Sequence, residues 1–154
     1  MWLNYFIIVV GGGPSGACAA EELAKNPDIE CVLFERKMDN AKPCGGAIPV
    51  CMVEEFKLPT EIIDRKVRKM KMISPSNVEV DIGQTLAPDE YIGMTRREIL
   101  DSYLRDRAIE YGAVLYNALV TEIQTPTNQD GKYKIKYANF ADNTKQEIDV
   151  DYII

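Results

Sequence analysis

The chain has 154 residues, 46% of them hydrophobic and 27% charged, a composition typical of a globular protein rather than a disordered or fibrous one. Its formal net charge of −6 argues against a nucleic-acid partner, because the phosphate backbone is itself negative. The chain contains no histidine, which excludes Ser-His-Asp catalysis and histidine acid–base catalysis within it. Any proton donor here must therefore be Cys, Asp, Glu, Tyr or Lys.

The beginning of the chain is predicted to form a β-α-β unit. An apolar strand at about 5–10 is followed by a helix at about 14–25. After the breaker sequence Asn26-Pro27-Asp28, a second apolar strand follows at about 30–35. This order predicts an α/β fold that begins with half of a parallel sheet.

The turn between the first strand and the helix is rich in glycine. Gly11, Gly13 and Gly16 form the pattern G-x-G-x-x-G, which brings backbone close to a dinucleotide pyrophosphate. A helix that starts near Ser15 also directs free N–H groups and the positive end of its dipole toward the ligand. Glu35 ends the second strand 19 residues after Gly16, where an acid is expected to bind a ribose hydroxyl.

Two other kinds of protein use similar turns. An ordinary glycine turn in an α/β protein stays open as the alternative, although strand, turn, helix, second strand and acid all agree with a dinucleotide site. A phosphate-binding P-loop is excluded, because Ala17 and Cys18 stand where that motif requires Lys and then Ser or Thr.

The middle of the chain is predicted to be mainly β-structure. After a loop at 37–46, residues 47–56 favour a short helix or two turns, since a proline interrupts them. Two stretches of alternating polarity, 67–73 and 78–82, predict a β-hairpin.

The clearest amphipathic helix is predicted at 96–111, after a short strand at 91–94. Thr95 and Glu98 have the spacing of an N-terminal capping box. The predicted apolar face consists of Leu100, Leu104, Ala108 and Tyr111.

Strands are predicted for the remainder of the chain. They lie at 114–116, 119–123, 133–137 and 146–154. The sequence Asn128-Gln129-Asp130-Gly131 favours a hairpin turn between two of them. Because 149–154 has the pattern of a buried strand with no turn or partner after it, we expect the chain to be a piece of a longer protein.

The four cysteines, Cys18, Cys31, Cys44 and Cys51, match no C-x-x-C redox or zinc spacing, so reduced thiols and no metal site are expected. Cys18 and Cys31 fall in the predicted helix and strand, where cysteine packs as a small hydrophobic residue. A packing role is also expected of Cys51. No apolar stretch reaches the ~20 residues that a membrane-spanning helix needs.

Several stretches together are specific enough to indicate a family. They are Glu35-Arg36-Lys37, Lys42-Pro43-Cys44-Gly45-Gly46-Ala47-Ile48-Pro49, Lys69 to Asn77, Asp81 to Thr85, Glu90 to Met94, Arg96-Arg97-Glu98 and Leu100 to Arg105. With them the chain resembles the geranylgeranyl reductase family, and most closely its photosynthetic branch. Members of that branch saturate the geranylgeranyl chain used in the side chains of chlorophyll, tocopherol and phylloquinone.

The resemblance implies a fold and a cofactor. The fold would be a Rossmann-like FAD-binding domain of the aromatic-hydroxylase type, with inserted β-hairpins. Residues 1–154 would form the N-terminal part of an FAD/NAD(P)-binding domain that is incomplete at its C-terminus. The remaining FAD-binding segment and the substrate domain would lie outside this chain.

The resemblance also assigns cofactor-binding residues. Glu35 would bind the adenosine ribose, with Arg36 beside the adenine or the ribose. Arg97 would face the FAD phosphates, and its spacing to Asp101 makes it a better candidate than Arg96. A solvated charge is the alternative for Arg97, but a cation near a helix N-terminus is unfavourable, which favours the ligand role. The backbone of Val120 would meet the adenine, unless it is an ordinary strand residue. The FAD pyrophosphate would be held by Gly11, Gly13, Pro14, Ser15 and Gly16.

Cys44, Gly45 and Gly46 form the segment that the resemblance implies to be catalytic. Two glycines allow the backbone to come close to the flavin ring or the substrate. Reduction of an isolated alkene needs a hydride, from flavin reduced by NADPH, and a proton from a positioned acid. Cys44 is the candidate for that acid or for a residue that lines its path, and a buried thiol in a turn is the structural alternative.

The function implied is FAD-dependent, NADPH-consuming reduction of the double bonds of a geranylgeranyl chain, carried by geranylgeranyl diphosphate or by chlorophyll. A flavin-dependent monooxygenase of the same fold and a non-catalytic nucleotide-binding fragment are the competing hypotheses. A lipid-like substrate implies peripheral association with a membrane. The photosynthetic branch implies a chloroplast, at the thylakoid, or a cyanobacterial cytoplasm or thylakoid surface.

Overall fold

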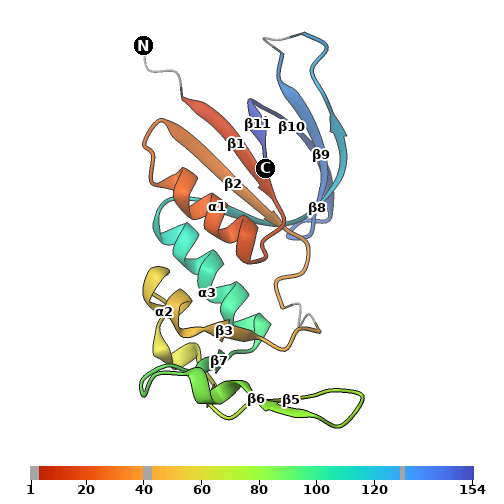
Figure 1. Cartoon of the computed structure of the whole chain (residues 1–154). Coiled ribbons are helices and arrows are strands. Elements are labelled where there is room, and N and C mark those ends of the chain that lie inside the picture. The colour runs from red at the N-terminus through yellow and green to blue at the C-terminus, as the bar shows by residue number, and fades with distance from the viewer. Residues whose placement is uncertain (1–3, 40–42, 129–130) are drawn as a thin grey trace. The chain divides into compact units, whose positions relative to one another are not determined.

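The computed structural model describes residues 4–39, 43–128 and 131–154. The chain divides into two compact units (Figure 1). The first unit comprises residues 1–40 and 101–154, and the second comprises residues 41–100. The boundary between them falls within helix α3 (Arg97–Glu110), after Leu100.

The first unit is built on one mixed sheet, which contains six strands of the described part of the chain, in the order β10-β9-β8-β2-β1-β11. Its elements, besides α3, are β1 (Tyr5–Val10), α1 (Pro14–Ala24), β2 (Ile29–Glu35), β8 (Val114–Gln124), β9 (Tyr133–Asn139), β10 (Thr144–Val150) and β11 (Tyr152–Ile153). The strands β11, β1, β2 and β8 pair in parallel, and β8, β9 and β10 continue antiparallel. The parallel sheet predicted from the first β-α-β unit is therefore confirmed.

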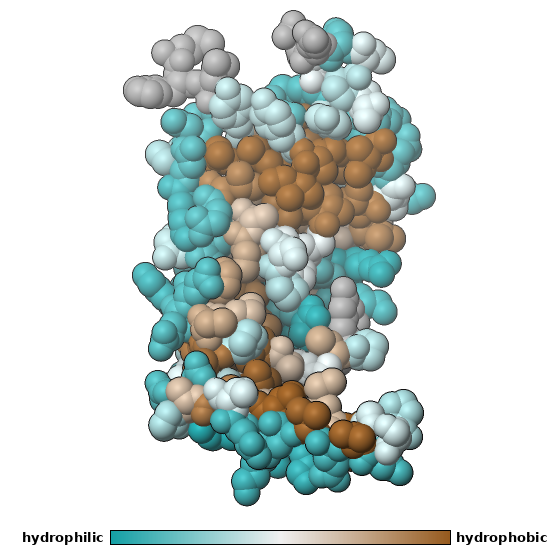
Figure 2. All heavy atoms as spheres, in the orientation of Figure 1, coloured by the Kyte–Doolittle hydropathy of each residue, from teal (hydrophilic) through white to brown (hydrophobic). Residues whose placement is uncertain are grey.

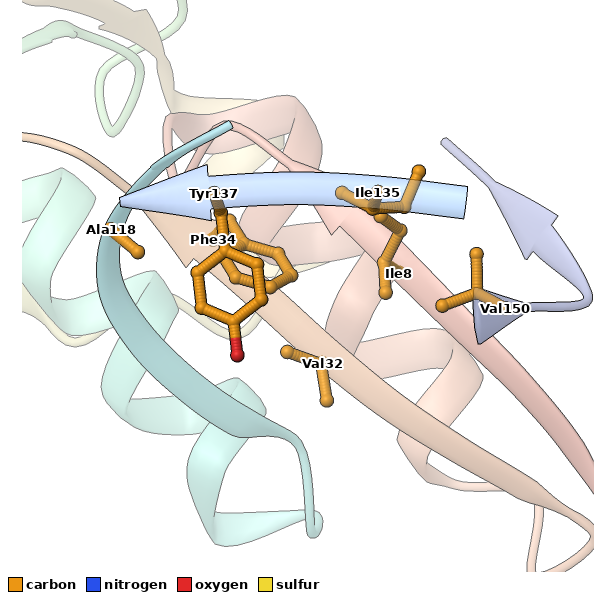
Figure 3. Packing of buried hydrophobic residues seen from close by; sticks show 7 residues of the cluster. All are labelled: Ile8, Val32, Phe34, Ala118, Ile135, Tyr137 and Val150. Carbon is orange, nitrogen blue, oxygen red and sulfur yellow. The ribbon is translucent and has the colours of Figure 1, made fainter. Parts of the chain in front are cut away.

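The side chains of β1 and β2 alternate between two cores. On one face, Val9, Cys31 and Leu33 pack with Ala20 of α1 and Ala108 of α3. On the other face, the cluster in Figure 3 consists of Ile8, Val32, Phe34, Ala118, Ile135, Tyr137 and Val150. Strands covered on both faces need nearly continuous apolar sequence, which explains why β1 and β2 do not alternate in polarity.

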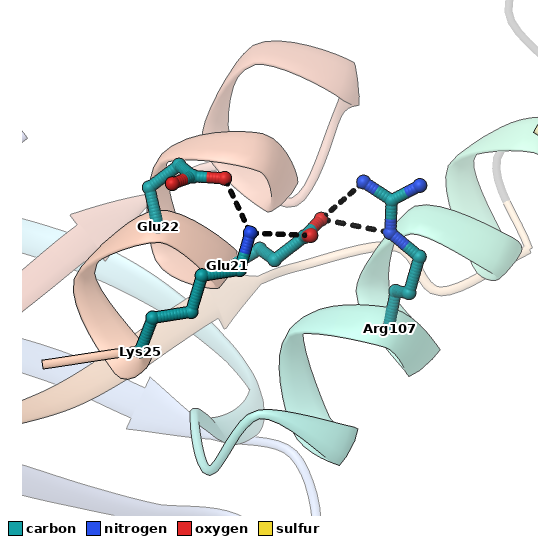
Figure 4. A network of polar contacts seen from close by, with 4 residues as sticks. All are labelled: Glu21, Glu22, Lys25 and Arg107. Atoms are coloured by element: carbon teal, nitrogen blue, oxygen red, sulfur yellow. Dashed lines mark hydrogen bonds and ion pairs between the residues drawn. The ribbon is translucent and has the colours of Figure 1, made fainter. Parts of the chain in front are cut away.

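Helices α1 and α3 are joined by a buried ion pair (Figure 4). The side chain of Glu21 on α1 is buried, and its Oε2 accepts a hydrogen bond from Nε of Arg107 on α3 at 2.8 Å and another from Nη2 of the same guanidinium. Nζ of Lys25 lies 3.0 Å from Oε1 of Glu21. Both oxygens of this buried carboxylate therefore have cationic partners.

The second unit holds two small sheets. A three-stranded antiparallel sheet has the order β3-β7-β4, and β5 pairs with β6. Its elements are β3 (Ala47–Pro49), α2 (Val50–Glu55), the 3-10 helix Thr60–Ile62, β4 (Arg65–Val67), β5 (Lys71–Ile73), β6 (Glu79–Asp81), the 3-10 helix Ile82–Thr85 and β7 (Ile92–Met94). Its buried residues include Ile48, Val53, Leu58 and Ile62.

Exposed hydrophobic side chains gather on the β5–β6 hairpin and over the strands of the first unit (Figure 2). On the hairpin they include Met72, Ile73 and Val80. None of the helices in the described part of the chain combines the length and the apolar character needed to span a bilayer.

Most predicted elements are confirmed, including the β-α-β unit, the strand at 91–94, the long helix and the β5–β6 hairpin. The predicted turn at 128–131 contains Gln129 and Asp130, which lie outside the described residues. The strands on either side of it, β8 and β9, pair antiparallel as a hairpin requires. The two strands predicted at 114–116 and 119–123 are one continuous strand, β8.

Some local predictions are wrong, and the short helix within 47–56 is confirmed only in part. The stretch 67–73 does not form one strand, because β4 and β5 belong to different sheets and the guanidinium of Arg68 between them donates to the carbonyl oxygens of Ala87 and Pro88. A short strand, β3, precedes the helix predicted within 47–56. The capping box is absent, since α3 begins at Arg97 and Oγ1 of Thr95 donates to the carbonyl of Arg96 instead.

The apolar face of α3 also differs from the prediction at its last position. Leu100, Leu104 and Ala108 are buried, whereas Tyr111 follows the end of the helix and is half exposed. The ammonium group of Lys25 lies 4.7 Å from the centre of its ring. The aromatic face therefore meets a cation rather than the core.

Candidate functional site

The glycine turn follows β1 and leads directly into α1. Gly11 has φ +117°, which favours glycine, and its N–H donates to the carbonyl of Phe34 at the end of β2 at 2.8 Å. A Cβ at Gly16 would lie 1.9 Å from the carbonyl oxygen of Gly11. Gly16 is therefore required for the close approach of α1 to the turn.

Gly13 is different, because nothing within the chain requires glycine there. It is the N-cap of α1 with φ −74° and ψ −178°, an extended conformation that any residue adopts. A Cβ at this position would meet no atom within 4 Å. The open space over Gly13 is therefore a place where a ligand can approach the backbone.

The N-terminus of α1 presents free donors to that space. Gly13 is the N-cap residue, and no side chain caps the N-terminus of α1. The first turn of this 11-residue helix carries no acidic residue. The first N–H groups of a helix lack partners within it, and the helix dipole makes this end positive. These properties fit the pyrophosphate of a dinucleotide such as FAD. Pro14 and Ser15 occupy the first two helical positions, where the sequence pattern placed them.

Glu35 lies beside the glycine turn, although 23 residues separate it from Gly12. Its Oε2 accepts the N–H of Gly12 at 2.7 Å, and its Oε1 accepts the N–H of Lys37 at 2.8 Å. A carboxylate oxygen can accept more than one hydrogen bond, so both oxygens keep capacity for a ribose hydroxyl. The structure thus brings together the turn and the predicted ribose-binding acid.

Two neighbours of Glu35 complete this side of the site. Arg36 follows it directly and is exposed. Asn117 of β8 lies opposite Glu35 in the parallel register, and its Nδ2 donates to the carbonyl of Glu35 at 3.2 Å. Asn117 was not predicted from the sequence, where it is a single amide within a strand pattern.

Val120 lies on β8 at a β-bulge. Val120 pairs with Tyr137 and Glu122 pairs with Lys136, so Thr121 is an extra residue in β8. A bulge leaves backbone groups of the extra residue outside the ladder, and bulges are frequent beside binding sites. This irregularity is compatible with the predicted contact between backbone at Val120 and adenine, which stays a prediction.

Sequence reasoning also missed Arg105 and Gly12. Arg105 is only 5% exposed, and its guanidinium donates to the carbonyls of Gly12 and Met38. The helical spacing of the sequence could have indicated that Arg105 is buried, because Arg105 lies one turn before Ala108, at the margin of the apolar face. Gly12 occupies a position that the G-x-G-x-x-G pattern leaves unspecified.

The segment of Cys44, Gly45 and Gly46 lies in the second unit. Gly46 has φ +65°, and a Cβ there would lie 1.8 Å from the carbonyl oxygen of Thr95. Its carbonyl accepts the N–H of Thr95 at 2.9 Å, so this glycine serves the packing of the unit itself. Gly45 has open space where a Cβ would be. Lys42, which begins the motif, lies outside the described residues.

The four thiols differ in environment. Cys44 and Cys51 are exposed, so the buried thiol considered for Cys44 and the packing role expected of Cys51 are both wrong. Burial raises the pKa of Cys31 to about 11. Burial is also the main cause that raises the pKa of Cys18. The thiols of Cys18 and Cys31 are therefore poor nucleophiles, in agreement with a packing role.

Arg97 lies in the first turn of α3, in the second unit, and its side chain is half buried. Its neighbour Arg96 is paired with Asp64, with Nε 3.1 Å from Oδ2. This ion pair lies within the second unit. The phosphate-binding role of Arg97 stays a prediction.

A family model matches the part of the chain that contains the glycine turn. Residues 1–79 match the model of the Thi4 family. The chain belongs to the Thi4 family. The matched residues of this chain include β1, α1, β2 and most of the second unit.

Curated relatives of this Thi4 family chain are geranylgeranyl diphosphate reductases. The chloroplastic enzyme of Nicotiana tabacum is 58% identical over 98% of this chain, and the enzyme of Synechocystis is 62% identical over 86% of it. The chain spans about a third of the length of these relatives, 33% and 32% respectively. The resemblance to the geranylgeranyl reductase family is confirmed.

Solved structures show the same fold. A geranylgeranyl bacteriochlorophyll reductase-like protein from Thermoplasma acidophilum has a TM-score of 0.80 at 21% identity, over 97% of this chain and 38% of that one. The myxobacterial chondrochloren halogenase, a variant of FAD-dependent halogenases, has a TM-score of 0.75 at 17% identity, over 97% of this chain and 36% of that one. The predicted Rossmann-like fold of FAD-dependent enzymes is thus confirmed.

Proposed function

We propose that this Thi4 family protein is an FAD-dependent reductase that uses NADPH to saturate carbon–carbon double bonds of a geranylgeranyl chain. The observation that carries the proposal is the open space beside Gly13 at the N-terminus of α1. No contact among the described residues requires glycine there, and the first N–H groups of α1 face this space without a side-chain cap. The names of relatives at 56% to 62% identity support the geranylgeranyl chain as substrate. The halogenases that share the fold are flavin-dependent, which supports FAD.

In this proposal the residues of the turn bind the FAD pyrophosphate through backbone N–H groups of Gly13, Ser15 and Gly16. Glu35 accepts ribose hydroxyls while it holds Gly12. Arg97 adds a positive charge for the phosphates, and backbone at Val120 meets the adenine. When bound, reduced FAD would supply the hydride for one alkene carbon.

Cys44 is proposed to supply the proton for the other alkene carbon. Its thiol is exposed, so it is accessible to a substrate, and the adjacent Gly45 leaves open space beside the backbone. The chain contains no histidine that could take this role. A proton held at Sγ of Cys44 and delivered as the hydride arrives would complete the saturation of one double bond.

The test is anaerobic turnover of the complete protein with geranylgeranyl diphosphate, followed by NADPH oxidation and by the mass of the product. We expect Cys44→Ala to lower kcat by about 100-fold or more, which is the usual contribution of a general acid. Cys51→Ala is the matched control, because it removes another exposed thiol from the same unit. Unchanged turnover of the Cys44→Ala protein would contradict the assignment of the acid.

A flavin-dependent monooxygenase is the second candidate, favoured by the structural similarity to p-nitrophenol 4-monooxygenase, with a TM-score of 0.68. Oxygen distinguishes the two reactions, since a monooxygenase needs it and the reductase does not. Turnover that requires oxygen and yields a hydroxylated product would overturn the reductase. FAD retention with no turnover of either kind would instead support a nucleotide-binding protein without catalysis.

The carrier of the geranylgeranyl chain and the location of the protein are also proposals. We propose geranylgeranyl diphosphate or geranylgeranylated chlorophyll as substrate, in a chloroplast or a cyanobacterium, at a membrane surface. Relatives from tobacco, rice and Arabidopsis thaliana are chloroplastic, and another comes from Synechocystis. Parallel assays with the free diphosphate and with the chlorophyll ester would rank the two carriers by kcat/KM.

A further inference from the structure

The guanidinium of Arg105 joins two segments of the first unit. Nη1 donates to the carbonyl of Gly12 at 3.0 Å, and Nη2 donates to the carbonyl of Met38 at 2.7 Å. Gly12 lies in the glycine turn, and Met38 lies in the loop that follows Glu35. One buried side chain therefore links the segment proposed to bind the diphosphate with the segment proposed to bind the ribose.

The bond to Gly12 fixes the orientation of one peptide group. In a trans peptide, the carbonyl of Gly12 and the N–H of Gly13 point in opposite directions. Because Arg105 holds the carbonyl, the N–H of Gly13 must point away from Arg105. No described residue accepts a backbone hydrogen bond from that N–H, and the space beside Gly13 is open.

Glu35 holds the same residue through its other backbone group, since it accepts the N–H of Gly12 at 2.7 Å. A Cβ at Gly12 would lie 2.9 Å from Cδ of Arg105 and 2.9 Å from Cβ of Glu35. The two side chains thus enclose Gly12 so closely that a larger residue would displace one of them. This enclosure explains a glycine that the dinucleotide pattern does not demand.

We propose that Arg105 is a positioning residue of the dinucleotide site. It holds the peptide between Gly12 and Gly13 so that the N–H of Gly13 faces the diphosphate. The proposal rests on the dinucleotide site described under the proposed function, and it does not require Arg105 to touch the ligand. It does require the planar fork of arginine, because two carbonyls are bonded at once and lysine presents a single ammonium group.

The test measures the affinity of the purified protein for ADP and for adenosine by calorimetric titration. We expect Arg105→Met to weaken ADP binding about tenfold, since it removes a charge-assisted hydrogen bond that orients a phosphate donor. Adenosine lacks the diphosphate, so its affinity should change less than about twofold. Arg105→Lys should fail to restore ADP affinity.

Arg107→Met is the matched control, because it removes an arginine from the same helix whose partner is Glu21 rather than the turn. It should lower Tm and leave both affinities unchanged. If Arg105→Met does not fold, Arg105→Gln tests the same clamp, because a single neutral amide replaces the charged fork that bonds two carbonyls. This variant should also weaken ADP binding more than adenosine binding.

The outcomes separate the two proposals. Equal loss of ADP and adenosine affinity, unchanged ADP affinity in the Arg105→Met protein, or full rescue by lysine would each overturn the positioning role. Absence of ADP and FAD binding by the unaltered protein would overturn the dinucleotide site itself, and the positioning role with it.

Discussion

At the scale of single residues, the four glycines of the turn have four different reasons to be glycine. Gly11 needs its positive φ, Gly12 is enclosed by side chains, and Gly16 lies against the carbonyl of Gly11. Gly13 alone has an ordinary conformation and empty space around its Cα. Because no contact among the described residues requires glycine at position 13, a substitution there can test the proposed ligand binding separately from folding.

We predict that Gly13→Ala keeps the free energy of unfolding within about 1 kcal/mol of the unaltered protein. Its methyl group would occupy the space proposed for the pyrophosphate, so FAD affinity should fall about tenfold or more. Chemical denaturation and FAD titration measure the two effects. A Gly13→Ala protein that binds FAD normally would contradict the placement of the pyrophosphate.

Gly16→Ala is the companion variant. Its Cβ would collide with the backbone oxygen of Gly11, so the helix or the turn must shift. We expect a loss of stability of about 3 kcal/mol together with a loss of FAD affinity. A stable Gly16→Ala protein would show that α1 can move away from the turn at little cost.

At the scale of elements, the ion pair of Glu21 and Arg107 joins α1 to α3. Burial by itself raises the pKa of Glu21, but the hydrogen bonds from Arg107 and Lys25 outweigh it and hold the pKa below the ordinary value of 4.5. A carboxyl group whose pKa is lowered by folding stabilises the folded state when it is ionised. Its contribution is complete above pH 4.5 and is lost as pH falls through the lower pKa of the folded state.

We predict that Glu21→Gln lowers the free energy of unfolding by about 3 kcal/mol at pH 7, because the charge–charge attraction of the buried ion pair with Arg107 is lost. The difference between the two proteins should shrink as the pH falls below 4.5. Urea denaturation at a series of pH values measures it. Glu22→Gln is the control, since Glu22 is exposed and forms a surface ion pair with Lys25; it should have little effect.

At the scale of the whole molecule, the hydrophobic cluster of Figure 3 is built from residues of distant parts of the chain. Phe34 of β2 lies 4.9 Å from Tyr137 of β9 and 5.6 Å from Tyr116 of β8, measured between ring centres. Val150 near the C-terminus and Ile8 near the N-terminus belong to the same cluster. Residues of β8, β9 and β10 thus pack against β1 and β2 in one cluster.

We predict that Ile135→Ala destabilises the protein by about 2–5 kcal/mol, because Ile135 is fully buried in this cluster and its truncation leaves a cavity. Ile109→Ala is the control, since Ile109 is an exposed isoleucine on α3 and alanine is a good helix former. Thermal denaturation of both proteins compares them. Equal melting temperatures would show that the antiparallel strands contribute little to the core.

The sequence by itself determined the elements and the residues whose pattern is local. The apolar runs, the glycine spacing and the acid at Glu35 predicted β1, α1, β2 and the dinucleotide turn, because strand and helix periods are visible in neighbouring residues. The exposed thiol of Cys44 and the break at Arg68 could not be predicted, since exposure and the contacts of a long side chain depend on what folds against it.

Only the tertiary structure decided which side chains hold the turn. Arg105 and Gly12 are 93 residues apart, and no periodicity relates them. Their contact exists because Arg105 of α3 reaches the glycine turn that follows β1. A hydrogen bond between such distant residues depends on the packing of the intervening elements. For this reason the glycine pattern predicted a dinucleotide ligand, whereas only the fold showed that Arg105 bonds the turn.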